Sequence, residues 1–360
     1  MRTHLNELDV NDTTNTETSV LRTEHLVKKY GNHTAVDHLS FHVEPGKIYG
    51  FLGPNGAGKS TTMNMMTGYI APTQGSVKIN GYDLIKDAEK AKSCIGYLPE
   101  IPPLYGEMTV KEYLSFVAEL KRIPKRERAD QLRQVMEMVM IQDMADRLIK
   151  NLSKGYKQRV GLAQAILGYP EVIILDEPTV GLDPKQIIEI RDLIKKLGEK
   201  HTVILSSHIL SEVQAVCDEI MIISKGKLVA CDTPEGLTGR VRGDAQIRIT
   251  LLGDREQAQK AVEMLEHVKA VSYEESSEKG CVSLVLQTEA GEDIRRELFY
   301  AMAKAGLPIM SLSRVERSLE DIFLELTEDG EEAVQKTEEA AVQDTEVPQK
   351  EGGEENDSNL

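Results

Sequence analysis

The stretch Gly53–Ser60 (G-P-N-G-A-G-K-S) fits the pattern G-x-x-x-x-G-K-[ST]. Glycines at this spacing let backbone N–H groups surround phosphate oxygens without Cβ clashes, while Lys59 can reach the β- and γ-phosphates. The hydroxyl of Ser60 can ligate Mg²⁺. The pattern arises by chance in roughly one chain in a hundred of this length, but here an apolar strand pattern precedes it and a helix pattern follows. We therefore predict a phosphate-binding loop.

Two acids, Asp176 and Glu177, follow the apolar run Val172–Leu175. At a strand end beside a phosphate-binding loop, Asp176 can hold Mg²⁺ through water, and Glu177 can polarise the attacking water as a general base. The plain alternative is a solvated turn at the end of a strand. The phosphate-binding loop makes that alternative the weaker one, because such a loop requires an acid on an adjacent strand.

Two further signals are weak when taken singly. Leu152–Arg159 (L-S-K-G-Y-K-Q-R) precedes a helix pattern, and a Ser hydroxyl, a Gly backbone N–H and a helix N-terminus together make a second anion site. His208 follows the strand-like run Thr202–Leu205 and two serines. A lone His there is more often a capped strand end than a catalytic group.

Taken in order, these features resemble the ABC ATPase family across about residues 22–239. The resemblance implies that Glu177, His208 and Lys59 are catalytic, and that Gly181–Pro184 is the D-loop. Its metal ligands would be Ser60, Asp176 and Glu100. The residues that it places around ATP run from the adenine-stacking Tyr30 through the phosphate loop to the signature motif and the D-loop: Tyr30, Gly53, Pro54, Asn55, Gly56, Ala57, Gly58, Lys59, Ser60, Thr61, Ser153, Gly155 and Asp183.

The resemblance also implies a mechanism. Two such domains would close head-to-tail around two ATP molecules, with Mg²⁺ as the metal. Ser153 and Gly155 of one copy would touch the γ-phosphate held by the other, and Asp183 would communicate across the interface. Because the chain has one set of motifs, it should pair with a copy of itself or with a sibling ATPase.

The sequence departs from the family pattern at three positions. Glu100 stands where the family usually has Gln, and Lys154 and Tyr156 stand where Gly and Gln are commonest. Glu100 can still ligate Mg²⁺ but adds negative charge near the phosphates. Since Ser153 and Gly155 are kept, we expect activity.

Short apolar runs, each followed by a polar turn and a helix pattern, predict an α/β fold with a largely parallel sheet. Examples are Lys47–Leu52, Val172–Leu175 and Thr202–Leu205. Residues 101–158 predict a helical insertion between two halves of the sheet. The resemblance completes the expected fold class, a P-loop ABC ATPase domain whose mostly parallel sheet carries an antiparallel subdomain.

We predict four segments: a disordered tail at 1–20, the ATP-binding domain at 21–239, a small α+β domain at 240–327 and an acidic disordered tail at 328–360. The third contains two β-α-β patterns in series, which suggests a split βαβ fold. Its strands are expected at Ile247–Leu252, Val268–Tyr273, Val282–Leu286 and Ile309–Val315, and its helices at Asp254–Glu266 and Asp293–Ala305. The second helix should turn Ile294, Leu298, Phe299 and Met302 inward. A capping box predicts a last short helix from Ser318 to Leu326.

The net charge of −16 is unevenly placed along the chain. Residues 328–360 carry −10 and residues 1–20 carry −3, which leaves −3 for residues 21–327. The nearly neutral body leaves polyanion binding open, but no Trp and only five Phe argue against base stacking. No nucleic-acid partner is therefore expected. The four cysteines, far apart in a chain without an apolar leader, favour a reduced cytosolic protein.

No run reaches the ~18 apolar residues of a spanning helix, so another protein would have to hold the chain at a membrane. The resemblance implies an integral membrane permease subunit as that partner. Y-L-P-E, L-S-K-G-Y and S-L-E-D-I-F-L-E-L resemble ATPase subunits of bacterial exporters with a separate permease. That implies a peripheral protein on the cytoplasmic face of the membrane, docked through its helical insertion. The alternatives are a soluble ABC ATPase of a regulatory, repair or translation type, disfavoured by the single ATPase block, and a P-loop kinase or GTPase. The C-terminal domain is equally compatible with a structural role and with ligand sensing.

Overall fold

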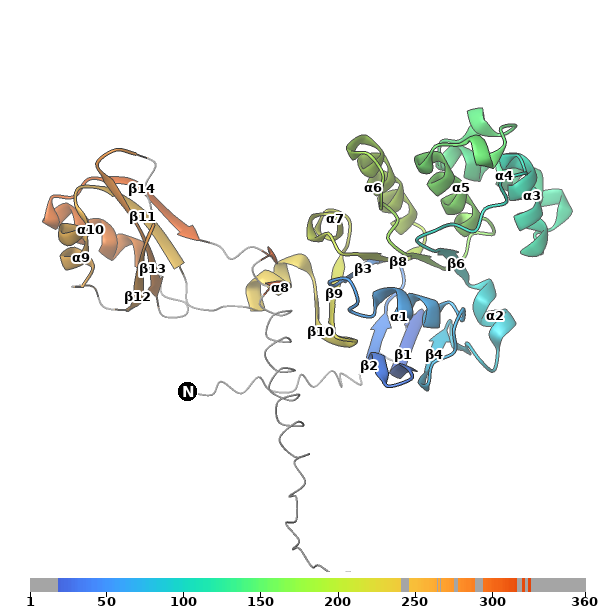
Figure 1. The fold of residues 1–360 in the computed structure, drawn as a ribbon, viewed down its shortest axis with the longest axis horizontal. Coiled ribbons are helices and arrows are strands. Elements are labelled where there is room, and N and C mark those ends of the chain that lie inside the picture. The colour runs from blue at the N-terminus through green and yellow to red at the C-terminus, as the bar shows by residue number, and fades with distance from the viewer. Residues whose placement is uncertain are drawn as a thin grey trace, which may run out of the picture.

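The computed structural model describes residues 19–240, 246–263, 265, 267–274, 278–288, 294–315, 319–320 and 323–324. Nearly all of the first predicted tail and all of the second lie outside these residues. The predicted last helix from Ser318 to Leu326 is described only at 319–320 and 323–324, which are helical. Figure 1 shows the arrangement of the described elements.

A six-stranded sheet of order β10-β9-β3-β8-β7-β6 forms the centre of the first unit. Strands β9, β3, β8, β7 and β6 are mutually parallel, and β10 pairs antiparallel at one edge. Their bounds are β3 Ile48–Leu52, β6 Ile95–Leu98, β7 Val172–Leu175, β8 Thr202–Ser207, β9 Glu219–Ser224 and β10 Lys227–Asp232. The three strands predicted from apolar runs are all present, and the expected α/β class is confirmed.

Both faces of this sheet are covered, which explains why β3, β7 and β8 are buried at every position. Alternate residues of a strand enter different cores: Ile173 and Leu175 of β7 belong to one cluster, and Val172 and Ile174 to another. Figure 1 shows α5 (Lys154–Ile166), α6 (Pro184–Gly198) and α7 (Leu210–Gln214) on one side. On the other side lie α1 (Lys59–Met66) and a second sheet.

This second sheet is antiparallel, with order β2-β1-β4-β5. Its strands are β1 Leu21–Tyr30, β2 His33–Val43, β4 Gln74–Ile79 and β5 Tyr82–Asp83, followed by α2 Ala88–Ser93. It supplies the antiparallel part that the family resemblance implied. Because the turn between β1 and β2 carries Tyr30 at its start, this sheet decides where that ring lies.

Residues 101–158 contain helices and no named strand among their described elements: α3 Val110–Leu120, α4 Lys125–Met138, two 3₁₀ turns at Gln142–Met144 and Ile149–Asn151, and the start of α5. Thr109 and Glu112 form a reciprocal capping box at the start of α3, which satisfies two backbone donors of its first turn. The last residues of α5 run beyond 158 and pack beside β6 and β7.

The C-terminal unit is an antiparallel sheet of order β12-β13-β11-β14. Its elements are β11 Gln246–Leu252, α9 Arg255–Val262, β12 Val268–Glu274, β13 Cys281–Thr288, α10 Arg295–Ala305 and β14 Ile309–Val315, after α8 Pro234–Arg240. This order and the two helices packed on one face have the split βαβ topology that was predicted. Their shared core includes Ile249, Ala258 and Leu298.

One inward prediction on α10 is wrong. Ile294, Leu298 and Met302 are buried as expected, but Phe299 is 54% exposed. The three buried residues are spaced by four and define the inner stripe, whereas Phe299 lies about 100° around the helix from Leu298. Its ring packs edge-on against the ring of Tyr300, with centroids 5.5 Å apart.

The described residues near the C-terminus return to the first unit. Leu319 is 3% exposed and belongs to the same cluster as Leu237 of α8 and Val213 of α7, and Phe323 packs against that cluster. The chain therefore leaves the first unit after α8, forms the C-terminal sheet, and contributes again to the first core.

Candidate functional site

The predicted phosphate loop lies between the end of β3 and the start of α1, above the carboxyl ends of the parallel strands. Gly58 is the N-cap of α1, with φ of 100°, a backbone conformation that is costly for residues with a side chain. A Cβ at this position would lie 2.5 Å from the Ala35 carbonyl oxygen. The first turn of α1 contains no acidic residue, so its N–H groups can face an anion without competition.

The Lys59 side chain is 6% exposed and points back along the loop. Its ammonium donates to the Gly53 carbonyl at 2.7 Å and to the Pro54 carbonyl at 3.3 Å. It also lies 3.7 Å from Glu177 Oε1. Burial lowers the pKa of Lys59, while the nearby carboxylates of Glu177, Asp176 and Glu100 act in the opposite direction. An anionic ligand would act in the same direction as the carboxylates and favour the charged ammonium.

Asp176 is 3% exposed at the end of β7. Its Oδ1 accepts hydrogen bonds from Ser60 Oγ at 3.2 Å and from Ser206 Oγ at 2.6 Å. The structure thus brings together Ser60 and Asp176, the two predicted metal ligands furthest apart in the sequence. Ser206 was not predicted as a site residue. The signal that could have found it is a hydroxyl at the end of β8, the strand next to β7.

Glu177 is buried beside Asp176, and its backbone has φ of 47°. Its N–H donates to Ser206 Oγ at 2.9 Å, and His208 Nδ1 lies 3.1 Å from Oε2 and 3.2 Å from Oε1. His208 is itself more open, with 40% of its side chain exposed. A positive φ is uncommon outside glycine, and here it directs the carboxylate toward Lys59 and His208. The arrangement can orient a carboxylate toward a water molecule next to bound phosphate.

A cavity of about 470 Å³ joins these groups. Ten predicted site residues line it, nine of them being Tyr30, Asn55, Gly56, Gly58, Lys59, Ser60, Thr61, Glu177 and His208. Glu100, a predicted metal ligand, lines it as well. Three lining residues were not predicted, His33, Ala35 and Val180; they belong to no motif, so the sequence gives no signal for them. Gly53, Pro54, Ala57 and Asp176 lie behind this lining in the loop and at the end of β7.

The remaining predicted residues are not part of this lining. Ser153 is the N-cap of α5, where its side chain accepts from the Tyr156 N–H. Gly155 is buried in the first turn of that helix. Asp183 is the N-cap of α6 and accepts from the Gln186 N–H at 2.9 Å. Within one chain, therefore, the first anion site and the second are separate surfaces.

The donor set around Ser60 suits a hard cation. A hydroxyl and carboxylate oxygens are ligands that Mg²⁺ prefers, and Mg²⁺ in such sites usually takes further ligands from water and substrate phosphates. No cluster of three His, Cys, Asp or Glu that could hold a metal occurs among the described residues. A site that shares its metal with a phosphate does not need one, since the protein supplies only one or two ligands.

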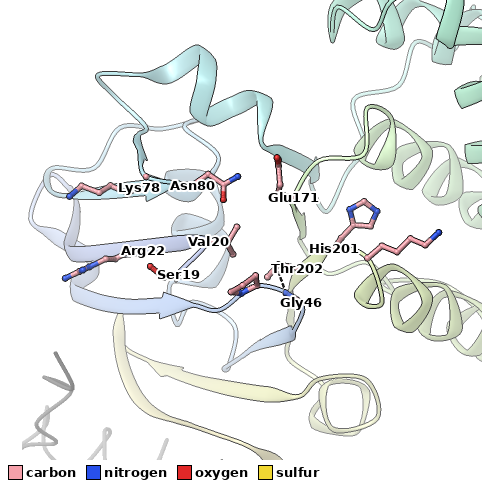
Figure 2. A pocket seen from close by; sticks show the side chains of 12 residues that line it. Ser19, Val20, Arg22, Gly46, Lys78, Asn80, Glu171, His201 and Thr202 are labelled. Carbon is pink, nitrogen blue, oxygen red and sulfur yellow. Dashed lines mark hydrogen bonds between the residues drawn. The ribbon is translucent and has the colours of Figure 1, made fainter. Parts of the chain in front are cut away.

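A larger cavity of about 760 Å³ lies elsewhere, between the antiparallel sheet and the starts of β7 and β8. Figure 2 shows that Arg22 and Lys78 extend away from it along the antiparallel sheet. Thr202 faces the cavity but is occupied, because its hydroxyl accepts from the Gly46 N–H at 3.0 Å. Because Arg22 and Lys78 point outward and the Thr202 hydroxyl is already bonded, we do not assign this cavity as the ligand site.

The exposed ring of Tyr30 supports a specific prediction about the mouth of the 470 Å³ cavity. Tyr30 is 51% exposed, and the Lys28 ammonium lies 5.3 Å from its ring centroid. Base–aromatic stacking contributes about 1–3 kcal/mol, so Tyr30→Ala should weaken ATP binding about tenfold and GTP binding equally. Titration of both nucleotides would check this, with Tyr30→Phe as the control that keeps the ring. A loss confined to one nucleotide would contradict simple stacking.

Comparisons with known proteins reveal a similar family and similar relatives. The family model described as "ABC transporter" matches residues 36–180. Over 310 residues the chain is 36% identical to the bacitracin transport ATP-binding protein BcrA of Bacillus licheniformis, covering 86% of this chain and 97% of that protein. It is 35% identical to the linearmycin resistance ATP-binding protein LnrL of Bacillus subtilis over 309 residues, covering 86% and 98%.

Solved structures give the same result. The structure of an ATP-binding subunit of an ABC transporter matches with a TM-score of 0.58 at 30% identity, covering 62% of this chain and 93% of that one. CbiO1 from Clostridium perfringens, part of the complex CbiONQ, matches with a TM-score of 0.56 at 26% identity, covering 69% and 96%. No helix in the described part of the chain is long and apolar enough to cross a bilayer.

Proposed function

The chain belongs to the ABC transporter ATP-binding proteins and is the ATPase subunit of such a transporter, and we propose that two copies close head-to-tail around two ATP molecules to drive a separate membrane permease. One observation carries the proposal. The phosphate loop and the Asp176–Glu177 pair meet at one cavity, whereas Ser153, Gly155 and Asp183 lie outside its lining. A second copy would bring those residues to the open side of the bound nucleotide.

The proposed roles follow from the geometry. The phosphate-loop N–H groups and Lys59 hold the β- and γ-phosphates, and Tyr30 stacks on the adenine. Ser60, Asp176 and Glu100 would hold Mg²⁺, which would neutralise phosphate charge. Glu177 orients and deprotonates the attacking water, and His208 holds the carboxylate and meets the γ-phosphate. Ser206 positions both acids, because its one hydroxyl donates to Asp176 and accepts from the Glu177 N–H.

An export role and a permease partner are supported by the relatives and by the surface. BcrA and LnrL are named for bacitracin transport and linearmycin resistance. The helical segment exposes large apolar side chains, with Ile101 83%, Leu120 64% and Tyr105 53% accessible. Exposed apolar groups of this size suit a protein interface. We place the permease contact here, with the ATPase bound peripherally at the cytoplasmic face of the membrane.

The domain division proposed from the sequence accompanies this function: ATP-binding residues 21–239, helical residues 101–158 among them, and an accessory unit from 240 to 327. The packing of Leu319 in the first core argues that the accessory unit includes a strap that returns to the ATP-binding unit. A role in stabilising the pair and a role in ligand sensing both fit this arrangement.

Paired action has a direct test in the purified full chain. If two copies make one hydrolysing unit, the rate per molecule should rise with protein concentration until pairing saturates. A rate per molecule independent of concentration, together with a monomeric mass in ATP, would refute the pairing. The permease partner is tested by purifying the tagged chain from membranes and identifying any multi-helix membrane protein that co-purifies with it. If no such membrane protein co-purifies with the chain, the proposal of a permease partner is rejected.

A further inference from the structure

Two unusual charges of opposite sign accompany the proposed ATP site. Glu100 is exposed and lines the nucleotide cavity. There it joins Asp176 and Glu177, so three carboxylates face one buried ammonium, that of Lys59. ATP is itself strongly anionic. The protein groups of one chain therefore supply one ammonium against three carboxylates where the γ-phosphate would lie, and the proposed Mg²⁺ would offset only part of the negative charge that these carboxylates and ATP add together.

Lys154 carries the opposite charge on the other anion site. It is the first residue of α5, directly after Ser153, and is exposed. None of the ion pairs found among residues 19–240 involves its ammonium. The first turn of α5 contains no acid. The charge of Lys154 is therefore available to a group outside the chain.

The ammonium of Lys154 lies close to the D-loop, and two glycines leave room for this approach. Gly181 has φ of 71°, and a methyl group on it would collide with the Lys154 ammonium. A methyl group on Gly155 would lie 2.6 Å from Gln186 Oε1. Both glycines thus let the start of α5 pack closely on the segment 181–186, which carries Asp183. Lys154, Ser153 and Asp183 are consequently presented together on one surface.

We propose that Lys154 of one copy supplies the positive charge that Glu100 makes necessary in the ATP site of the other copy. This inference rests on the proposed head-to-tail pairing. In that arrangement Ser153 meets the partner's γ-phosphate, so the adjacent Lys154 comes near the same phosphate and near the partner's Glu100. Lys154 is then a specificity-determining residue for pairing, and its contribution to the affinity of pairing depends on the carboxylate at position 100.

A double-mutant cycle in the full chain tests this coupling. All variants carry Glu177→Gln, which holds ATP without turnover, and the dissociation constant of ATP-driven pairing is measured by sedimentation. Lys154→Gln should weaken pairing about tenfold, as expected for one charge interaction a few ångströms away at a partly screened interface. Lys154→Arg should stay within about twofold. The loss from Lys154→Gln should also shrink at high salt, where charge interactions are screened.

The second edge of the cycle distinguishes charge compensation from a purely structural role. In the Glu100→Gln background, Lys154→Gln should raise the dissociation constant of pairing by less than about threefold, because the carboxylate that Lys154 would compensate is gone. Coupled residues show such non-additivity. Equal losses with and without Glu100 would overturn the inference, as would an unchanged constant for Lys154→Gln. Lys196→Gln, an exposed charge in the last turn of α6, is the matched control and should have no effect.

The Glu177→Gln chain without further changes distinguishes a failure of this inference from a failure of the proposed head-to-tail pairing. If the Glu177→Gln chain pairs in ATP but ignores Lys154, only the coupling of Lys154 to Glu100 fails. If the Glu177→Gln chain shows no pairing at any ATP concentration, the proposed head-to-tail mechanism fails, and the proposed coupling between Lys154 and Glu100 fails with it. Thermal melting of each variant without nucleotide checks that a lost pairing is not lost folding.

Discussion

Glu177→Gln should lower the rate of ATP hydrolysis by about 10²–10⁴-fold, the usual contribution of a positioned general base, while ATP still binds. An amide of the same shape can keep a contact with His208, which lies within 3.2 Å of both carboxylate oxygens. It cannot accept the proton of the attacking water. The measurement is phosphate release under saturating ATP, compared with equilibrium binding of ATP by the same preparation.

The control for this variant is Glu137→Gln, an exposed acid on α4, which should leave turnover within about twofold. Loss of binding together with turnover would mean that Glu177 holds the loop rather than activates water. That outcome is a real alternative, because Lys59 lies 3.7 Å from Glu177. Full turnover in the variant would exclude Glu177 as the base.

Lys59→Met should weaken ATP binding about 100-fold. This loss of affinity is separate from any effect on the rate of hydrolysis. Hydrogen bonds to charged groups contribute about 1.5–3 kcal/mol each, and about 2.7 kcal/mol corresponds to 100-fold in affinity. Without the ammonium, the phosphates would also face the carboxylates of Asp176, Glu177 and Glu100 with no cation from the loop. Equilibrium titration of ATP with the full chain measures the loss.

Methionine keeps the apolar stem of Lys59, so the buried site is filled and folding should survive. Lys111→Met, an exposed change on α3, controls for removing one positive charge from the protein as a whole. Because the lost interaction is electrostatic at close range, the 100-fold ratio should persist at high salt, where contributions from distant charges are screened. An affinity within about threefold of the original would show that loop N–H groups alone bind the phosphates.

Much of the site could be predicted because each of its main motifs is a short continuous segment of the sequence. The phosphate loop, the Asp176–Glu177 pair and His208 each occupy a strand end, where a polar residue after an apolar run is visible in the sequence. The sequence could not show that the Ser206 hydroxyl joins Asp176 to Glu177. That contact depends on β8 lying beside β7, which only the folded sheet establishes.

The limits of periodicity explain the other differences. Strand bounds agreed to within a residue or two wherever a run was wholly apolar, because such runs are buried on both faces. Phe299 was misplaced because helical spacing gives an angle but not the width of the buried stripe, and here the stripe of Ile294, Leu298 and Met302 is too narrow to include it. His33 and Ala35 reach the nucleotide cavity because the turn from β1 brings the start of β2 there, and no residue pattern in the sequence marks them.

The burial of Leu319 changes how the C-terminal unit can move. A unit attached only through α8 could swivel about that one connection. Leu319 packs in the first core together with residues of α7 and α8. The C-terminal unit is therefore attached to the first unit at two points, through α8 before its sheet and through Leu319 after it. Since α7 begins two residues after His208, a displacement of the C-terminal unit would reach the segment that carries the histidine in contact with Glu177.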